Sequence, residues 1–134
     1  MYKRQIQKYW LKGDNAGTSE IFIENLPGFP DNVSSSEEGI FWVALFNPRN
    51  DFIEMSSNKP FLRKIVLRLP ESLQPQPINH SYVLGLDEGG KVVYNLQYKA
   101  DEAYSPITSV KQYENNLYFG SLTHAGWGKI EIPK

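Results

Sequence analysis

The stretch DNVSSSEEGIFWVAL, residues 31–45, recurs in the chain as TSVKQYENNLYFGSL, residues 108–122, and the two segments align without a gap. Each copy reads as a strand, a turn and a second strand with an aromatic pair. The shared positions are Val33 with Val110, Glu37 with Glu114, Phe41 with Tyr118, Trp42 with Phe119 and Leu45 with Leu122. We interpret them as two copies of one antiparallel unit. The alternative is that two unrelated amphipathic hairpins look alike.

Short segments of the same kind make up most of the chain, each bounded by Gly, Pro, Asn or Asp, as strands of antiparallel sheets are. We predict strands at 6–11, 20–24, 32–35, 40–46, 82–87, 92–98, 108–113, 117–122 and 128–132. A hairpin turn is predicted at Glu88-Gly89-Gly90. Radial repetition of small antiparallel sheets builds β-propellers, so the predicted fold class is all-β and propeller-like.

The offset between the two copies, 108 minus 31, is 77 residues, which exceeds a plain blade of about 40–50 residues. We attribute the excess to an insertion at about 47–80, in which NKPFLRKIVLRLP predicts a short helix between Pro60 and Pro70. Its apolar stripe consists of Phe61, Leu62, Ile65, Val66 and Leu69, and its basic residues are Arg63, Lys64 and Arg68. We expect this helix to cap one end of the propeller. Contact with a membrane surface is the less favoured alternative.

Composition limits the class of protein. The chain has 134 residues, enough for one domain at most, and 40% hydrophobic and 13% aromatic residues are typical of a globular protein. A formal net charge of -1 gives no sign of a polyanion, so no nucleic-acid partner is expected. The sequence has no cysteine, which excludes disulfides, thiolate nucleophiles and cysteine-based zinc sites but leaves the compartment open.

The first five residues, MYKRQ, correspond to what a transposon end used in preparing sequencing libraries encodes, and we interpret 1–5 as an assembly scar. A genuine basic N-terminus is the alternative. The remaining chain would then hold an outer strand pair (6–24), one whole blade (31–98) and most of another (107–132). We expect such a chain alone to expose sheet edges and to fold poorly. A periplasmic, secreted or membrane-anchored location stays open.

Three strings carry a family resemblance: KYWLKGDNAGTSEIFIENLPGFPDNV, FWVALFNPR and LYFGSL. They resemble the C-terminal part of strictosidine synthase-like proteins, from about Ile6 to Ile132. The resemblance implies a six-bladed β-propeller with a pocket at one end of its central channel, of which residues 6–134 would be the C-terminal part. That fold is similar to those of paraoxonases, gluconolactonases and the adipocyte plasma membrane-associated protein.

The resemblance implies two chemistries. Strictosidine synthase itself relies on a glutamate at the start of the innermost strand of the last blade, which acts as a general acid and base. The matching position here is Thr108, or Ser109 if the register slips by one residue. A hydroxyl group does not exchange protons near neutrality as a carboxyl group does, so amine-aldehyde condensation is disfavoured.

The second chemistry is calcium-assisted hydrolysis. In paraoxonases and gluconolactonases an aspartate at the start of an inner strand binds calcium, and the string Pro30-Asp31-Asn32 matches that motif. The resemblance therefore implies Asp31 as a calcium ligand and Asn32 as a second one. Calcium takes six to eight oxygens, so further ligands would come from earlier blades. The alternative for the pair is an Asx-type turn after Pro30.

The resulting interpretation is a calcium-dependent hydrolase of hydrophobic esters or lactones on a six-bladed propeller. One alternative is a propeller that binds a metal and a ligand without turnover, and another is a condensing lyase whose carboxylate comes from elsewhere. Besides Pro30 and Thr108, the pocket candidates include His124 in the loop LTHAGWG. No residue is assigned as the catalyst, and His80 is expected to be a loop histidine.

Overall fold

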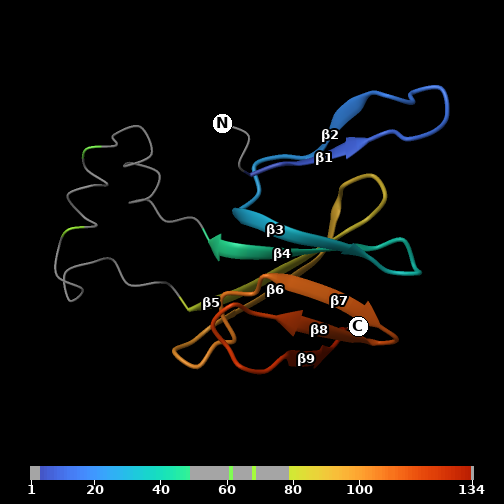
Figure 1. Cartoon of the computed structure of the whole chain (residues 1–134). Helices are drawn as coiled ribbons and strands as arrows, with labels where there is room; N and C mark the ends of the chain where they lie inside the picture. Colours follow the sequence, from blue (N-terminus) through green and yellow to red (C-terminus); the bar gives the residue numbers. More distant parts are fainter. Residues whose placement is uncertain (1–3, 49–60, 62–67, 69–78, 134) are drawn as a thin grey trace.

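A computed structural model of the chain describes residues 4–48, 61, 68 and 79–133, and the described part is built from β-strands (Figure 1). Their bounds are β1 (Ile6–Tyr9), β2 (Ser19–Ile23), β3 (Gly28–Ser35), β4 (Phe41–Pro48), β5 (His80–Leu86), β6 (Val92–Lys99), β7 (Ser109–Tyr113), β8 (Asn116–Gly120) and β9 (Gly128–Glu131). Every predicted strand is thus confirmed, with ends that differ by a few residues. The predicted cap helix lies, apart from Phe61 and Arg68, outside the described residues.

The strands form three antiparallel sheets in which chain neighbours pair with each other. The sheets are β1-β2, then β3-β4-β5-β6, then β7-β8-β9. The all-β class is therefore confirmed as three separate antiparallel sheets. The turn predicted between β5 and β6 is confirmed as well, because the backbone N–H of Asp87 donates to the carbonyl of Lys91 at 2.9 Å and Gly90 takes a positive φ of 81°.

The four-stranded sheet lies between the other two sheets, which Figure 1 shows above and below it. Because side chains alternate along a strand, β4 sends Trp42 and Ala44 to one face and Val43 and Leu45 to the other. Two cores result. One gathers Leu26, Val43, Leu45, Tyr82, Leu84 and Leu86 toward the two-stranded sheet, and the other gathers Trp42, Ala44, Val83, Ile107, Val110, Leu117, Phe119 and Ile132 toward the three-stranded sheet.

Trp42 connects the second core across the two sheets. Its indole N–H donates to Gln112 Oε1 at 2.6 Å, and its ring lies 5.1 Å from the ring of Tyr94. Gly85 pairs with Trp42 on one side and with Tyr94 on the other, so the two rings meet over a residue without a side chain. An added Cβ on Gly85 would lie 2.9 Å from the Tyr94 ring and 3.0 Å from Trp42.

The two repeat copies do not pair in the same register. In the first hairpin Val33 lies opposite Val43, whereas in the second Val110 lies opposite Phe119, although the gapless alignment places Gly120 there. The alignment is therefore wrong by one residue on its second strand. The reason is loop length: residues 36–40 separate β3 from β4, but the two residues 114–115 form a tight turn between β7 and β8, with Glu114 at a positive φ of 51°. A loop with an odd number of residues and a loop with an even number cannot give the same pairing register.

This shift explains why matched residues differ in burial. Leu45 is fully buried in a core, whereas Leu122, its partner in the gapless alignment, is 80% exposed beyond the end of β8. The first strands are unaffected, because the loop follows them. Val33 and Val110 therefore remain equivalent, and so do Asp31 and Thr108.

Candidate functional site at the starts of two adjacent strands

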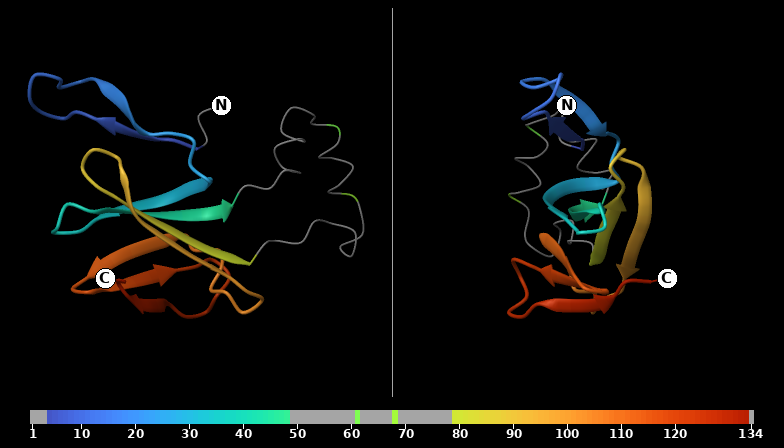
Figure 2. Two further views of the ribbon diagram at one scale, coloured as in Figure 1. Left: turned by 180° about the vertical axis from the view of Figure 1, so that it is seen from behind. Right: turned by 90° about the vertical axis from the view of Figure 1, so that its right-hand side faces the viewer.

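β3 and β7 lie side by side and run in the same direction, as Figures 1 and 2 show. The hydroxyl of Ser34 donates to the carbonyl of Val110 at 2.6 Å and so fixes one strand against the other. Following both strands back toward their starts leads to Asn32 and Asp31 on β3 and to Thr108 just before β7. The structure therefore brings the candidate ligand pair and Thr108 to the same end of two neighbouring strands.

Asp31 lies inside β3 at a β-bulge. Pro30 pairs with Leu45 and Asn32 with Ala44, so Asp31 is the extra residue that has no counterpart on β4. The pair therefore does not stand at the start of its strand, as the resemblance implied, since β3 already begins at Gly28. A bulge leaves one residue out of the ladder and redirects its side chain, which is how a turn-favouring Asp fits in a strand here.

The side chains of Asp31 and Asn32 are both exposed, and Pro30 before them is half-buried. Within residues 4–48 and 79–133, no hydrogen bond or ion pair engages the Asp31 carboxylate or the Asn32 amide. Up to three oxygen atoms of the hard type that calcium prefers are thus available at this point. The described part of the chain holds no group of three or more His, Cys, Asp or Glu side chains suited to a metal ion.

Thr108 is held by the backbone of the next strand. Its N–H donates to the carbonyl of Gly120 at 2.9 Å, and its hydroxyl donates to the same oxygen at 3.3 Å. Ser109, the other candidate for the glutamate position, pairs with Gly120 and is half-buried. Neither side chain is a carboxyl group, and the Thr108 hydroxyl is already used to fix the start of β7.

His124 lies in the loop that joins β8 to β9, which leaves the sheet next to Gly120 and so at the same end as Thr108. Its Nε2 lies 3.2 Å from the carbonyl oxygen of Ser105, and its ring stacks on Tyr104 with 4.6 Å between the ring centroids. A carbonyl oxygen only accepts, so this contact places a proton on Nε2. His124 is exposed, and its ring is oriented by two neighbours.

Ser105 ties several segments together at this end of the molecule. Among the described residues, Ser105 is the polar residue that is buried, with 9% of its surface exposed. Its hydroxyl donates to the carbonyl of His80 and accepts from the N–H of His80, both at 3.2 Å. Its carbonyl accepts from the Thr123 hydroxyl as well as from His124. The start of β5 and the β8–β9 loop are thus fixed to one residue.

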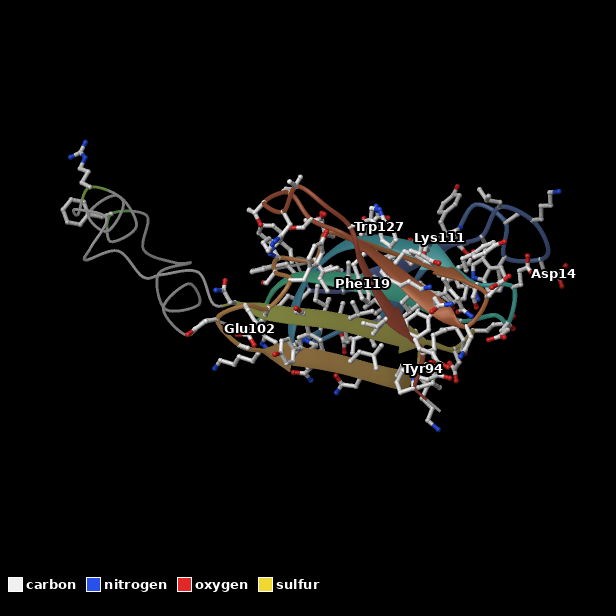
Figure 3. All side chains as sticks on the ribbon, turned by 90° about the horizontal axis from the view of Figure 1, so that it is seen from below. Asp14, Tyr94, Glu102, Lys111, Phe119 and Trp127 are labelled. Atoms are coloured by element: carbon white, nitrogen blue, oxygen red, sulfur yellow. The ribbon has the colours of Figure 1, made fainter. Side chains whose placement is uncertain are left out.

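Two glutamates, Glu102 and Glu114, lie near Thr108 in the sequence but not at the start of β7. A hydrogen bond with its own backbone, and then the one from the Tyr98 hydroxyl at 2.9 Å, lower the pKa of Glu102. The same contact raises the pKa of Tyr98. Glu102 lies at the edge of the fold in Figure 3, and Glu114 lies in the β7–β8 turn, at the end opposite to Thr108. Neither glutamate replaces the missing carboxylate at the start of β7.

A cavity of about 680 Å³, which the sequence did not predict, lies between the four-stranded and three-stranded sheets. Its walls come from β5, β6, β8 and β9 and from the segment before β7. The lining residues are Ser81, Val83, Asn95, Leu96, Gln97, Tyr98, Glu102, Tyr104, Ile107, Phe119, Gly128, Lys129, Ile130, Glu131 and Pro133. The alternation of side chains along each strand does not reveal this cavity. The cavity arises where the four-stranded sheet has one strand more than the three-stranded sheet.

The bulge at Asp31, by contrast, is indicated by the sequence. Proline cannot donate to a strand ladder and is confined to edges, first positions and bulges. Pro30 next to two residues that favour turns therefore marks an interrupted strand. For membrane contact, no helix within the described residues is long and apolar enough to cross a bilayer.

Comparison with known proteins identifies relatives, although no family model matches the chain. The chain is 38% identical over 124 residues to the strictosidine synthase-like 10 protein of Arabidopsis thaliana, covering 88% of this chain and 33% of that protein. It is 35% identical over 135 residues to strictosidine synthase-like 3 of the same plant, covering 96% and 34%. The bovine (Bos taurus) adipocyte plasma membrane-associated protein is 29% identical over 124 residues, covering 88% and 30%. The chain thus spans about a third of the length of the curated relatives it matches.

Proposed function

Because the chain belongs to the strictosidine synthase-like and adipocyte plasma membrane-associated protein family, we propose that it forms part of a six-bladed β-propeller that hydrolyses esters or lactones with the help of calcium. The single observation that carries the proposal is the bulge at Asp31. It puts an exposed carboxylate, with an amide beside it, inside β3, the strand next to β7.

The sheet arrangement supports the propeller. Each sheet is a meander of consecutive antiparallel strands, and the middle sheet packs its two faces on the sheets before and after it in the chain. Blades of a propeller pack in this serial way. The neighbouring first strands β3 and β7 would then be the innermost strands around the central channel, which is where the family resemblance expects the pocket.

The side chains at the β3 bulge fit part of a calcium site. Asp31 and Asn32 supply oxygen donors that the described residues leave unengaged, and calcium accepts carboxylate and amide oxygens readily. Six to eight oxygens are needed, so the remaining ligands would come from parts of the complete protein outside this chain. Bound calcium polarises a carbonyl group and stabilises the oxyanion that forms on attack. Asp31 and Asn32 would hold and orient the calcium ion.

Condensation of an amine with an aldehyde has less support. That chemistry needs a carboxyl group within hydrogen-bond reach of the reacting nitrogen. Thr108 stands at the corresponding position, and its hydroxyl donates to the Gly120 carbonyl. A second candidate function, binding of a metal and an apolar ligand without turnover, is favoured by the fact that the described part offers oxygen ligands but no assigned base.

The test uses the complete protein that contains this chain. Hydrolysis of an aryl ester and of an aliphatic lactone is followed with calcium and with chelator. The variants are Asp31→Ala and, as a matched control, Glu37→Ala, which removes an exposed carboxylate in the turn at the other end of β3. We expect chelator and Asp31→Ala each to lower the rate at least a hundredfold, because the oxyanion loses its stabilising charge. Glu37→Ala should keep the wild-type rate.

Two results would change the proposal. Turnover that is unaffected by both chelator and Asp31→Ala would refute the calcium mechanism. If neither substrate is hydrolysed but calcium raises the melting temperature of the wild type and not of Asp31→Ala, the metal site is retained. The function would then be ligand binding without hydrolysis.

A further inference from the structure

β3 is held against β7 by a hydrogen bond close to the bulge that carries the candidate ligands. The hydroxyl of Ser34 donates to the carbonyl oxygen of Val110 at 2.6 Å, and this contact is partly buried. From Asn32 to Ser35 the pairing of β3 with β4 is regular, so Asn32 and Ser34, two residues apart, turn their side chains to the same face. Asn32 therefore faces β7, as Ser34 does.

This hydrogen bond sets the register of the two strands at the candidate site. Because both strands run in the same direction, a step of two residues back along each leads from Ser34 to Asn32 and from Val110 to Thr108. Each step covers about 6.6 Å, since a strand rises by about 3.3 Å per residue. Asn32 is thus brought alongside Thr108, and any sliding of β3 on β7 would change that pairing directly.

Other contacts restrain this part of β3 less. Asp31 has no counterpart on β4, so the β3–β4 ladder holds the neighbours of Asp31 but not Asp31 itself. On the face turned away from β7, Val33 is 42% exposed. The hydrogen bond from Trp42 to Gln112, at 2.6 Å, also joins the two sheets, but it reaches β7 two residues farther from its start than Val110. Among the described residues, the serine hydroxyl therefore makes the hydrogen bond to β7 that lies nearest the bulge.

We propose that Ser34 is a positioning residue of the metal site, whose hydrogen bond to β7 holds Asp31 and Asn32 where they bind calcium. This inference rests on the calcium site of the proposed function and not on the hydrolysis. Calcium binds its oxygen ligands at about 2.3–2.6 Å, so ligands from different blades must be held in a fixed relation to one another. Loss of a partner that orients metal ligands typically weakens metal binding by about 10–100-fold.

The coupling between the metal and this hydrogen bond works in both directions. Calcium held by the bulge and by ligands from other blades opposes sliding of β3 on β7, and the hydrogen bond from Ser34 opposes the same movement. Each therefore stabilises the other by an equal free energy. Calcium should raise the unfolding midpoint of the wild type by more than that of a variant without the hydroxyl.

The test measures calcium binding by titration calorimetry in the complete protein that contains this chain. Substitutions of Ser34 form a graded series, in which Thr keeps the hydroxyl, Cys keeps the size but donates weakly, and Ala removes the donor. We expect Ser34→Thr to keep the wild-type Kd and Ser34→Ala to raise the Kd by about 10–100-fold, with Ser34→Cys between them. The chain has no other cysteine with which the Cys variant could form a disulfide.

Gln112→Leu is the matched control. It removes the other hydrogen bond between the two sheets and leaves the buried indole N–H of Trp42 unpaired, so it should destabilise the fold by an amount similar to that of Ser34→Ala. Its Kd for calcium should remain that of the wild type, because the lost contact lies farther from the bulge. All proteins are compared at a temperature at which their unfolding curves show them to be folded.

Several results would overturn the positioning role. One is a wild-type Kd in both Ser34→Ala and Ser34→Cys. Another is an equal loss of affinity in Gln112→Leu, since that loss would come from a general loosening of the sheets. Weak binding by Ser34→Thr would assign the effect to side-chain shape and would also overturn it. Absence of calcium binding in the wild type would refute the metal site together with this inference, whereas graded calcium binding without turnover would refute only the hydrolysis.

Discussion

Gly85 offers a sharp test of the packing between the four-stranded and three-stranded sheets. Adding one methyl group by Gly85→Ala places a Cβ 2.9 Å from the Tyr94 ring and 3.0 Å from Trp42. The Trp42 ring cannot move freely, because its N–H is bonded to Gln112 and it is fully buried. Overpacking of this kind costs about 1–3 kcal/mol, even though Ala is a better strand residue than Gly.

The assay is urea unfolding of the complete protein, followed by tryptophan fluorescence. With a destabilisation of about 2 kcal/mol and a slope of about 3 kcal/mol per M, the midpoint should fall by about 0.7 M. Gly89→Ala is the matched control, because a Cβ there meets only Asp87 Oδ1 at an ordinary 3.4 Å. We expect its midpoint to stay within the range of about 0.5 kcal/mol that is typical of surface substitutions.

An unchanged or higher midpoint in Gly85→Ala would refute this account. It would mean that Trp42 and Tyr94 adapt without cost, and that the hydrogen bond from Trp42 to Gln112 does not fix the ring. A fall of equal size in both variants would also contradict it, because the effect would then not come from the contact with Trp42 and Tyr94, and the reduced backbone freedom of the unfolded chain would raise both midpoints.

Two further predictions concern the same sheets. Ser34→Ala should lower the free energy of unfolding by about 1–3 kcal/mol, because it leaves the Val110 carbonyl without its donor between β3 and β7; urea unfolding against Ser19→Ala, an exposed position, measures this, and equal midpoints would contradict it. Burial raises the pKa of the Tyr82 hydroxyl above its ordinary value of 10.0, although a hydrogen bond with Asn95 opposes it. The stability that this neutral hydroxyl contributes is present below pH 10 and is lost as the pH rises through the higher folded-state pKa, so unfolding midpoints above pH 10 should fall more steeply in the wild type than in Tyr82→Phe; parallel curves would contradict this.

Local patterns were enough to predict the strands and not enough to predict their register. Alternation and turn residues locate each strand, because both signals lie within a few residues of it. Register depends on loop length and on which face is buried. Val33 lies opposite Val43 across residues 36–40, whereas Val110 lies opposite Phe119 across the turn at Glu114 and Asn115. A comparison of letters cannot detect that difference, since it shifts the second strand by a single residue.

In the candidate site, too, some features could be predicted from the sequence and others depend on how the strands pair. Asp31 and Thr108 could be matched from the sequence because they precede the loops that differ in length. The bulge that exposes Asp31 could be suspected from Pro30, but its position required the pairing of β3 with β4. The cavity between β6 and β9 could not be predicted, because it arises from a difference in strand number between two sheets.

The exposure of Val33 bears on how the site around Asp31 would be completed. Val110 is 4% exposed because it packs on the four-stranded sheet, whereas its equivalent Val33 is 42% exposed. Ser34 faces β7, so Val33 points the other way, toward the side of the two-stranded sheet. That sheet holds β1 and β2 but, within the described residues, nothing that corresponds to β3 and β4. A strand that lay beside β3 as β3 lies beside β7 would start next to Asp31. We therefore expect that strand to supply the next oxygen ligand to the proposed calcium site.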